Sequence, residues 1–345
     1  MAIKTACLRN WPNLDVVVAY TLLEEALSAS LEVTFESRNL MLSDDEVRDL
    51  AARGVFTIGV GKGRTYEDCK VDGKTFGSET SLLLYGVRSH ERLGNDGSVR
   101  ELEAWMDRDN ADGRLTKKQP YSAGWIMHQA FRLGYDHQEV VNRVAHVVRV
   151  LIDSTRMKKE KRPDLGMHEA AKKCSAMALL SRGDYYGPFT VRRYIRDMFM
   201  LGHDEKEIVA KAGWFIEVHE KAKRREVAAK KVAETAKFDA FCLSRHQEFG
   251  TWAESDDPYL MSRLGQDKDL VVMRNSKGNI IMMSQEFDFS DIAAVLAEKE
   301  PGLWYFDEDR NILANGTESE PAPVTALARE SIQVCVATRV KRRRF

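Results

Sequence analysis

Four aspartates are the residues best suited, by type and spacing, to metal chemistry. Asp15 falls in the first turn of an expected helix, and Asp107, Asp109 and Asp112 cluster at the end of another. Carboxylates that converge at strand or helix ends can bind Mg²⁺ or Mn²⁺, hard ions that prefer oxygen ligands. Such ions activate water for attack on phosphorus. The alternative is that Asp15 is a favourable helix-start residue and that the other three occupy a solvated turn.

A glycine-rich turn offers a second kind of chemistry. Gly59, Gly61 and Gly63 alternate after an expected strand, at the start of a turn-rich segment that extends to Cys69. Backbone N–H groups in such a run can hold a phosphate, but the spacing matches neither the P-loop nor the dinucleotide fingerprint. The alternative is a flexible turn without a ligand.

Several other catalytic signatures are missing from the sequence. The five cysteines form no CxxC pair, the eight histidines include no HExxH, and there is no GxSxG. A cysteine zinc site is therefore not expected, and a serine hydrolase triad has no support. The odd number of scattered cysteines argues against a disulfide framework and predicts a reducing, cytoplasmic location.

Two basic stretches, residues 156–162 and 221–231, and the basic tail could follow a phosphate backbone. The ordinary alternative for the second stretch, KAKRREVAAKK, is a solvated helix face. Because 52 Lys and Arg balance 53 Asp and Glu, any attraction to nucleic acid must be local. No apolar run reaches the roughly 20 residues needed to span a bilayer, so no membrane association is expected.

The elements that must position these residues follow an α/β order. Strands are expected at residues 2–8, 31–36 and 55–58, with helices at 14–31 and from 43 between them, which predicts a mostly parallel sheet that binds ligands at the carboxyl ends of its strands. Helices are also expected at 78–85, 99–107 and 290–299. Residues 121–237 have helical periodicity throughout, and two strands at 270–273 and 280–283 flank a turn.

These elements predict four parts. They are an α/β domain at residues 1–120, a helical connecting region at 121–237, a smaller C-terminal α/β domain at 238–335, and a basic tail at 336–345. The length, 345 residues, also fits about two domains rather than one small core.

In this order the motifs resemble the DHH phosphoesterase superfamily, and within it the melanocyte-proliferating-gene family of metal-dependent exonucleases. Its first motif, an Asp that leads an apolar helix, is matched by residues 13–23. Its strand ending Asp-Val-Gly-Gly is matched by residues 58–61, its Tyr/Phe-Asp-His-His by 66–70, its Ser-rich helix start by 74–82 and its Asp-x-x-Asp-Asn-Gly by 107–113. The matches are specific over about the first third of the chain.

The chain also departs from that family's pattern. Leu8 and Asn13 replace the histidines of the first turn, Gly59 replaces the Asp of the second motif, and Glu67-Asp68-Cys69 replaces Asp-His-His.

The resemblance implies a metal-dependent phosphoesterase or nuclease relative that acts on nucleic acid or nucleotides with Mg²⁺ or Mn²⁺. Its metal ligands would be Asp15, Glu67, Asp68, Asp107 and Asp109, of which Asp15, Asp68 and Asp109 would be catalytic. Lys62, Arg64 and Lys70 would bind phosphate. The alternative is a catalytically inactive binding or scaffold protein with the same fold, and homo-oligomers remain open in either case.

Overall fold

The computed structural model describes residues 3–36, 44–60, 73–86, 93, 96–112, 121–160, 169, 171–175, 188–243, 248–307, 311–316 and 323–342. The chain divides into two compact units, Met1–Ala222 and Lys223–Phe345, each with a hydrophobic core of its own. Within the described ranges, no helix combines the length and the apolar character that a membrane crossing requires.

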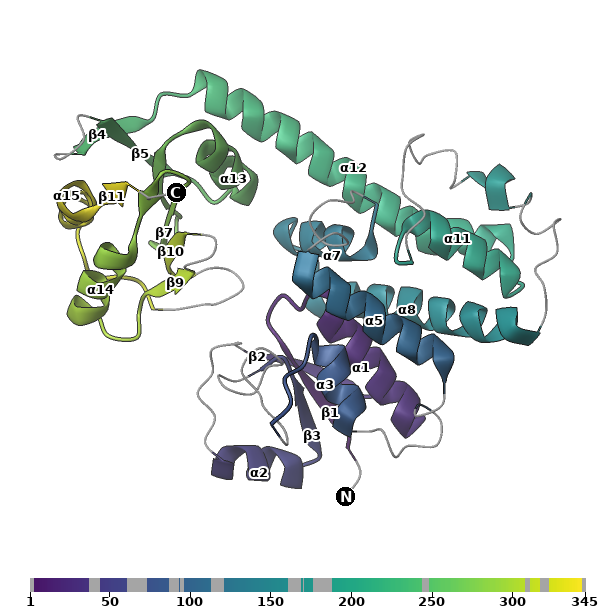
Figure 1. Cartoon of the computed structure of the whole chain (residues 1–345). Coiled ribbons are helices and arrows are strands. Elements are labelled where there is room, and N and C mark those ends of the chain that lie inside the picture. Colours follow the sequence, from purple (N-terminus) through teal and green to yellow (C-terminus); the bar gives the residue numbers. More distant parts are fainter. Residues whose placement is uncertain are drawn as a thin grey trace. The chain divides into compact units, whose positions relative to one another are not determined.

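The first unit is built on a three-stranded parallel sheet in the order β2-β1-β3 (Figure 1). β1 (Thr5–Arg9) lies in the centre and pairs in parallel with β2 (Glu32–Glu36) and β3 (Val55–Ile58). The connections contain α1 (Leu14–Leu27) and α2 (Asp44–Ala52). The predicted parallel α/β sheet is confirmed, and the carboxyl ends of all three strands lie at one edge.

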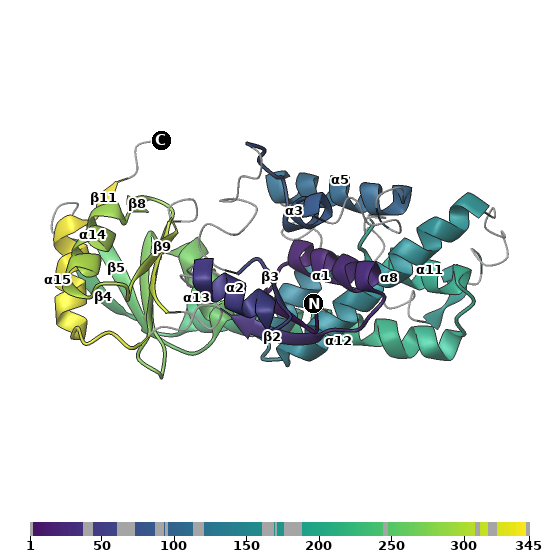
Figure 2. The same cartoon turned by 90° about the horizontal axis from the view of Figure 1, so that it is seen from below.

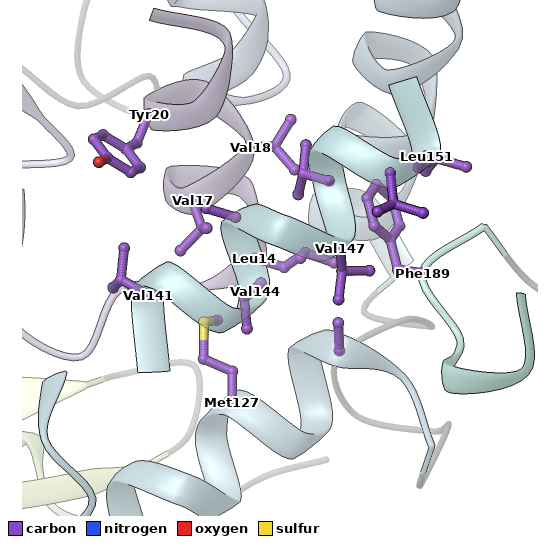
Figure 3. Close-up of a cluster of buried hydrophobic side chains, with 14 of the residues drawn as sticks. Leu14, Val17, Val18, Tyr20, Met127, Val141, Val144, Val147, Leu151 and Phe189 are labelled. Atoms are coloured by element: carbon purple, nitrogen blue, oxygen red, sulfur yellow. The ribbon is translucent and has the colours of Figure 1, made fainter. Parts of the chain in front are cut away.

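The first helix, α1, forms the centre of this unit's core. The Asn13 side chain accepts a hydrogen bond from the N–H of Val16 and caps the helix start, while Ser28 ends the helix in the left-handed conformation. Almost every α1 side chain is buried, as expected for a helix that is apolar on all sides. Its main helical neighbour is α8 (His137–Glu160). Figure 3 shows the side chains that fill this contact, among them Leu14, Val17, Val18, Val141, Val144, Val147 and Leu151.

Outside the sheet, the described residues of the first unit are mainly helical, which confirms the predicted helical middle section. The further helices are α3 (Glu79–Gly86), α5 (Gly97–Asp112), α7 (Ala123–Arg132), α11 (Val191–Met200) and α12 (Glu205–Thr235). The last of these runs across the boundary at residue 222.

The second unit is a smaller α/β lobe, also as predicted. Its six-stranded sheet has the order β4-β5-β6-β7-β10-β9, from β4 (Asp239–Leu243), β5 (Glu248–Glu254), β6 (Leu270–Arg274), β7 (Ile280–Ser284), β9 (Tyr305–Asp307) and β10 (Ile312–Asn315). β6 and β7 form the expected antiparallel hairpin. β8 (Phe287–Asp288) pairs with β11 (Lys341–Arg342) in a separate ribbon.

Helices cover both faces of this second sheet. Within the unit, α13 (Pro258–Asp267) lies on one face, while α14 (Ser290–Lys299) and α15 (Arg329–Arg339) lie on the other (Figures 1 and 2). The elements β4, β5, α13 and α15 were not anticipated from the sequence. α15 continues past residue 335, where the sequence suggested that the domain ends, and the division into four parts stays a prediction.

Candidate functional site

The Asp15 side chain extends from α1 toward the start of α3, and the residue is buried, with 3 % of its surface exposed. Its Oδ2 accepts hydrogen bonds from the backbone N–H of Glu79, at 2.7 Å, and from Asn110 Nδ2, at 3.0 Å. Its Oδ1 accepts from the N–H of Thr80, at 3.0 Å, and from Thr80 Oγ1, at 2.6 Å. The carboxylate therefore connects three helices: α1, α3 and α5.

These contacts occupy the acceptor capacity of the Asp15 carboxylate. A carboxylate has about four lone-pair sites, and here four donors point at its two oxygens. Two of the donors are the first backbone N–H groups of α3, which have no partner inside the helix and carry the positive end of its dipole. Asp15 thus acts as an N-terminal cap supplied from another helix, and in this geometry it has no free lone pair to offer a metal ion.

Asp107 also contacts the start of α3, but through a different residue. Its Oδ1 accepts a hydrogen bond from Ser78 Oγ at 2.5 Å. The Ser78 hydroxyl in turn accepts from the N–H of Ser81, and Ser81 Oγ accepts from the N–H of Ser78, a reciprocal capping arrangement. A Cβ on Gly77 would lie 2.8 Å from Asp107 Oδ1, so the close approach of α5 requires glycine there.

The third described acidic candidate, Asp109, does not share the face of Asp107. Residues two apart on a helix point to nearly opposite sides. Asp109 is buried, with 8 % exposed, and makes interactions of its own. Across the residues that the structure describes, no group of three or more His, Cys, Asp or Glu side chains is placed to hold a metal ion. The described donors therefore do not fit a divalent metal.

The remaining predicted site residues are Glu67, Asp68, Lys62, Arg64 and Lys70, and they lie outside the described residues. The ligand set as a whole stays a prediction.

Gly59, which stands where the resembled family has an aspartate, ends β3 in the left-handed conformation. Its φ is +66°, and a Cβ there would meet Val16 Cγ2 at 3.0 Å and Arg9 Cδ at 3.4 Å. An L-residue with a side chain is unfavourable at such a φ and is crowded by α1 as well. A residue with a side chain would therefore be both strained and crowded at this strand end, and glycine is not.

Thr80, Asn110 and Ser78 complete the site. They lie in the segments 74–82 and 107–113 that were matched to motifs of the resembled family, but none of them was among the predicted site residues. Asn110 also donates to the carbonyl of Gly77, at 3.1 Å, so that it ties α5 to the turn before α3. The available signal was the pair Ser78 and Ser81, whose spacing is typical of a helix N-terminus. The pairing of Asp15 with residues 65 and 95 positions away has no local signal.

Several described residues of the two basic stretches form ion pairs. Arg156 bonds to Asp96 at 2.8 Å and to Glu25 at 3.3 Å, and these contacts, opposed by partial burial, raise its pKa. On α12, acidic residues one turn away pair with several of the lysines of 221–231. These pairs are Lys221 with Glu217, Lys223 with Glu226 and Lys230 with Glu234. Nucleic-acid binding by this helix stays a prediction.

A separate polar network connects α8, α11 and α12. Lys211 Nζ lies 2.6 Å from Nε2 of His146, and the Tyr194 hydroxyl lies 3.1 Å from Nδ1. Burial, together with the positive charge of Lys211, lowers the pKa of His146 to about 4. Glu207 bonds to both Lys211 and His203, which lowers the pKa of Glu207 to about 2. The network keeps His146 neutral, with Nε2 as the acceptor from Lys211.

Comparison with known proteins by sequence assigns the chain to no family. No family model matches it. No curated protein matches it either.

Among solved structures, it is similar to RecJ from Thermus thermophilus, determined in complex with Mg²⁺, with a TM-score of 0.42 and 13 % identity over 97 % of this chain. The match covers 49 % of the RecJ chain, so the present chain spans about half the length of that protein. An uncharacterized protein from Helicobacter pylori aligns with a TM-score of 0.31 and 10 % identity, over 93 % of this chain and 94 % of the other. Similarities at this level carry no argument about function.

Proposed function

We propose that this protein binds nucleic acid or nucleotides without hydrolysing them, as a catalytically inactive relative of the DHH phosphoesterases. The observation that carries the proposal is the Asp15 carboxylate, which is buried and fully hydrogen-bonded to protein donors. A two-metal site needs several carboxylates or histidines with open lone pairs that converge on one point. Asp15 instead holds α3 and α5 in place.

The binding part of the proposal rests on the architecture of the sheet edge. In open parallel sheets, ligands bind outside the carboxyl ends of the strands. Asp15, Gly59 and the start of α3 all lie near this edge. Lys62, Arg64 and Lys70 follow the end of β3 by 4, 6 and 12 positions in sequence and are proposed to attract phosphate.

A second candidate function is metal-dependent phosphodiester hydrolysis. It is favoured by one observation, that Asp15 and Asp107 both reach the start of α3. Glu67 and Asp68 follow the end of β3 by nine and ten residues. This candidate requires Asp15 to release protein donors in exchange for Mg²⁺ or Mn²⁺. Its catalytic residues would be Asp15, Asp68 and Asp109.

One set of measurements separates the two candidates. The purified protein is dialysed against Mg²⁺ or Mn²⁺ and analysed for bound metal, and it is then incubated with short RNA, DNA and dinucleotides. For a binding protein we expect no stoichiometric metal, no cleavage, and salt-dependent oligonucleotide binding that EDTA leaves unchanged. Bound metal together with cleavage that Asp15→Asn abolishes, in a variant that keeps its circular dichroism, would establish the hydrolase instead.

The phosphate-binding residues are tested in the same assay. The triple substitution of Lys62, Arg64 and Lys70 by glutamine should weaken oligonucleotide binding and reduce its salt dependence. Lys172→Gln is the matched control, because this lysine is exposed and pairs with Glu169 on its own helical segment. Equal binding by the triple variant and the control would contradict the assignment of phosphate binding to these three residues.

A further inference from the structure

A small aromatic group lies directly after β1, in the turn that leads into α1. The Trp11 indole stacks on the Phe131 ring, with centroids 5.7 Å apart and an interplanar angle of 25°. The exposed His128 ring meets the indole edge-on, with centroids 6.0 Å apart. Phe131 is fully buried in the core of the first unit, so the indole packs on a ring that the core holds in place. We refer to Trp11, Phe131 and His128 as the aromatic shelf.

The backbone of Trp11 is held in a conformation that is unfavourable for a residue with a large side chain. Its φ is +48°, one of three positive values among the described non-glycine residues. This left-handed conformation is easy for glycine, tolerable for asparagine and unfavourable for a bulky side chain. Residues held in unfavourable backbone regions concentrate at ligand-binding sites, where the surrounding structure imposes the conformation. The flanking residues do so here, since Pro12 is buried and Asn13 caps α1.

The indole is only half-buried. Within the described part of the chain, no protein acceptor bonds to Trp11 Nε1. Trp304, which is also partly buried, instead donates its indole N–H to Glu300 at 2.8 Å. Trp11 packs on the core through Phe131, and the part of its ring that is not buried offers a planar apolar surface.

The position of the shelf determines what it could receive. It follows the central strand of the parallel sheet, at the edge where ligands bind. Two residues before it, Arg9 ends β1, and the Arg9 side chain lies against Gly59 at the end of β3. A planar ring, a nearby cation and a strand-end backbone together match a nucleobase attached to a sugar phosphate.

We infer that the aromatic shelf stacks a nucleobase, so that Trp11 is the base-binding residue of the proposed nucleotide or nucleic-acid site. This inference rests on the proposed function and specifies its ligand. Base stacking on an aromatic side chain is worth roughly tenfold or more in affinity and tolerates different bases.

The test compares a nucleotide with the same sugar phosphate lacking its base. Adenosine monophosphate and ribose 5-phosphate are titrated by calorimetry into the wild type and into Trp11→Ala and Trp11→Phe. We expect Trp11→Ala to weaken adenosine monophosphate binding by about tenfold or more, Trp11→Phe to retain most of it, and ribose 5-phosphate to bind equally to all three. Trp304→Phe, in the other unit, is the control and should change nothing.

A second variant distinguishes a loss of nucleotide binding from a loss of stability. Trp11→Gly suits the positive φ better than alanine, so it should match or exceed the thermal midpoint of Trp11→Ala while binding adenosine monophosphate as weakly. If the two variants bind the nucleotide as tightly as the wild type, or lose both ligands equally, the shelf is not a base site. If the wild type binds oligonucleotides but these variants are unaffected, only this inference fails. If the wild type binds no nucleotide or nucleic acid at all, the proposed function fails with it.

Discussion

Removing the Asp15 carboxylate tests whether it is a structural cap or a metal ligand. In Asp15→Asn the side chain keeps its shape, but one oxygen becomes an NH₂ group that faces the donors it formerly accepted. If the NH₂ replaces Oδ2, it confronts the N–H of Glu79 and Nδ2 of Asn110. Asp15→Ala removes all acceptors and leaves buried donors unpaired.

The magnitude follows from the number and type of bonds lost. A hydrogen bond to a charged group contributes about 1.5–3 kcal/mol, and a buried donor left without a partner loses its full desolvation energy. We expect the free energy of unfolding to fall by about 2–3 kcal/mol for Asp15→Asn and about 3–5 kcal/mol for Asp15→Ala. The total stability of a domain is about 5–15 kcal/mol, so both changes are large.

The assay is urea unfolding in the presence of EDTA, followed by circular dichroism, with hydrogen exchange of a peptide that spans α3. Exchange of the Glu79 and Thr80 amides should speed up in both variants, because these amides donate to Asp15. Asp45→Asn is the control, since that side chain is 86 % exposed and pairs with Arg48 on the surface, and it should change stability by about 0.5 kcal/mol or less.

If Asp15 is a cap, Asp15→Asn should lower the free energy of unfolding in EDTA; if it is a metal ligand, the substitution should not. Metal ligands repel one another without their ion, so neutralising one of them in EDTA leaves stability unchanged or raises it. An Asp15→Asn variant as stable as the wild type in EDTA, with unchanged exchange in α3, would refute the assignment of Asp15 as a cap.

Three further predictions concern the first unit. The pKa of His146 is lowered from 6.5 to about 4, so the contribution of this neutral ring to stability is complete above pH 6.5 and is lost as the pH falls toward 4. We expect this contribution to be about 2 kcal/mol for the half-buried ring. His146→Gln should therefore flatten the pH dependence of the urea midpoint between pH 4 and 6.5. Gly59→Ala should lower stability by about 1–2 kcal/mol, because φ is +66° and the new methyl meets α1; an unchanged melting temperature would contradict this. Arg149→Met should lower stability by about 2–3 kcal/mol, because the buried Glu24 loses its cationic partner, whereas Glu24→Gln combined with Arg149→Met should recover part of the loss in a double-mutant cycle.

Elements with strong local patterns were predictable from the sequence. β3 was expected at residues 55–58 and α14 at 290–299, and both are observed with those bounds. The first is β-branched and bounded by glycine, and the second has continuous helical periodicity, so each carries its own signal. β4 and β5 were missed because their pattern is weak. β4 is an edge strand with mostly exposed side chains and therefore lacks the alternation that marks a half-buried strand.

The candidate site shows the same limit. Its residue types indicated metal chemistry because aspartates favour both metal sites and helix ends, and composition does not separate the two. Which applies depends on the atoms around each carboxylate, and for Asp15 these come from residues far along the chain. The aromatic shelf was likewise not apparent, because Trp11 and Phe131 are separated by 120 positions.

The sequence by itself determined the α/β class, the parallel pairing of the first three strands, the helical middle section and the presence of a second α/β lobe. These follow from periodicity, turn residues and short connections, which act over a few residues. Only the tertiary structure decided that Asp15 caps α3, that Gly59 excludes a side chain at its strand end, and that Trp11 lies on Phe131. Hydrogen-bond saturation, steric exclusion and ring stacking act over a few ångströms between distant segments, so they are set once the chain has packed.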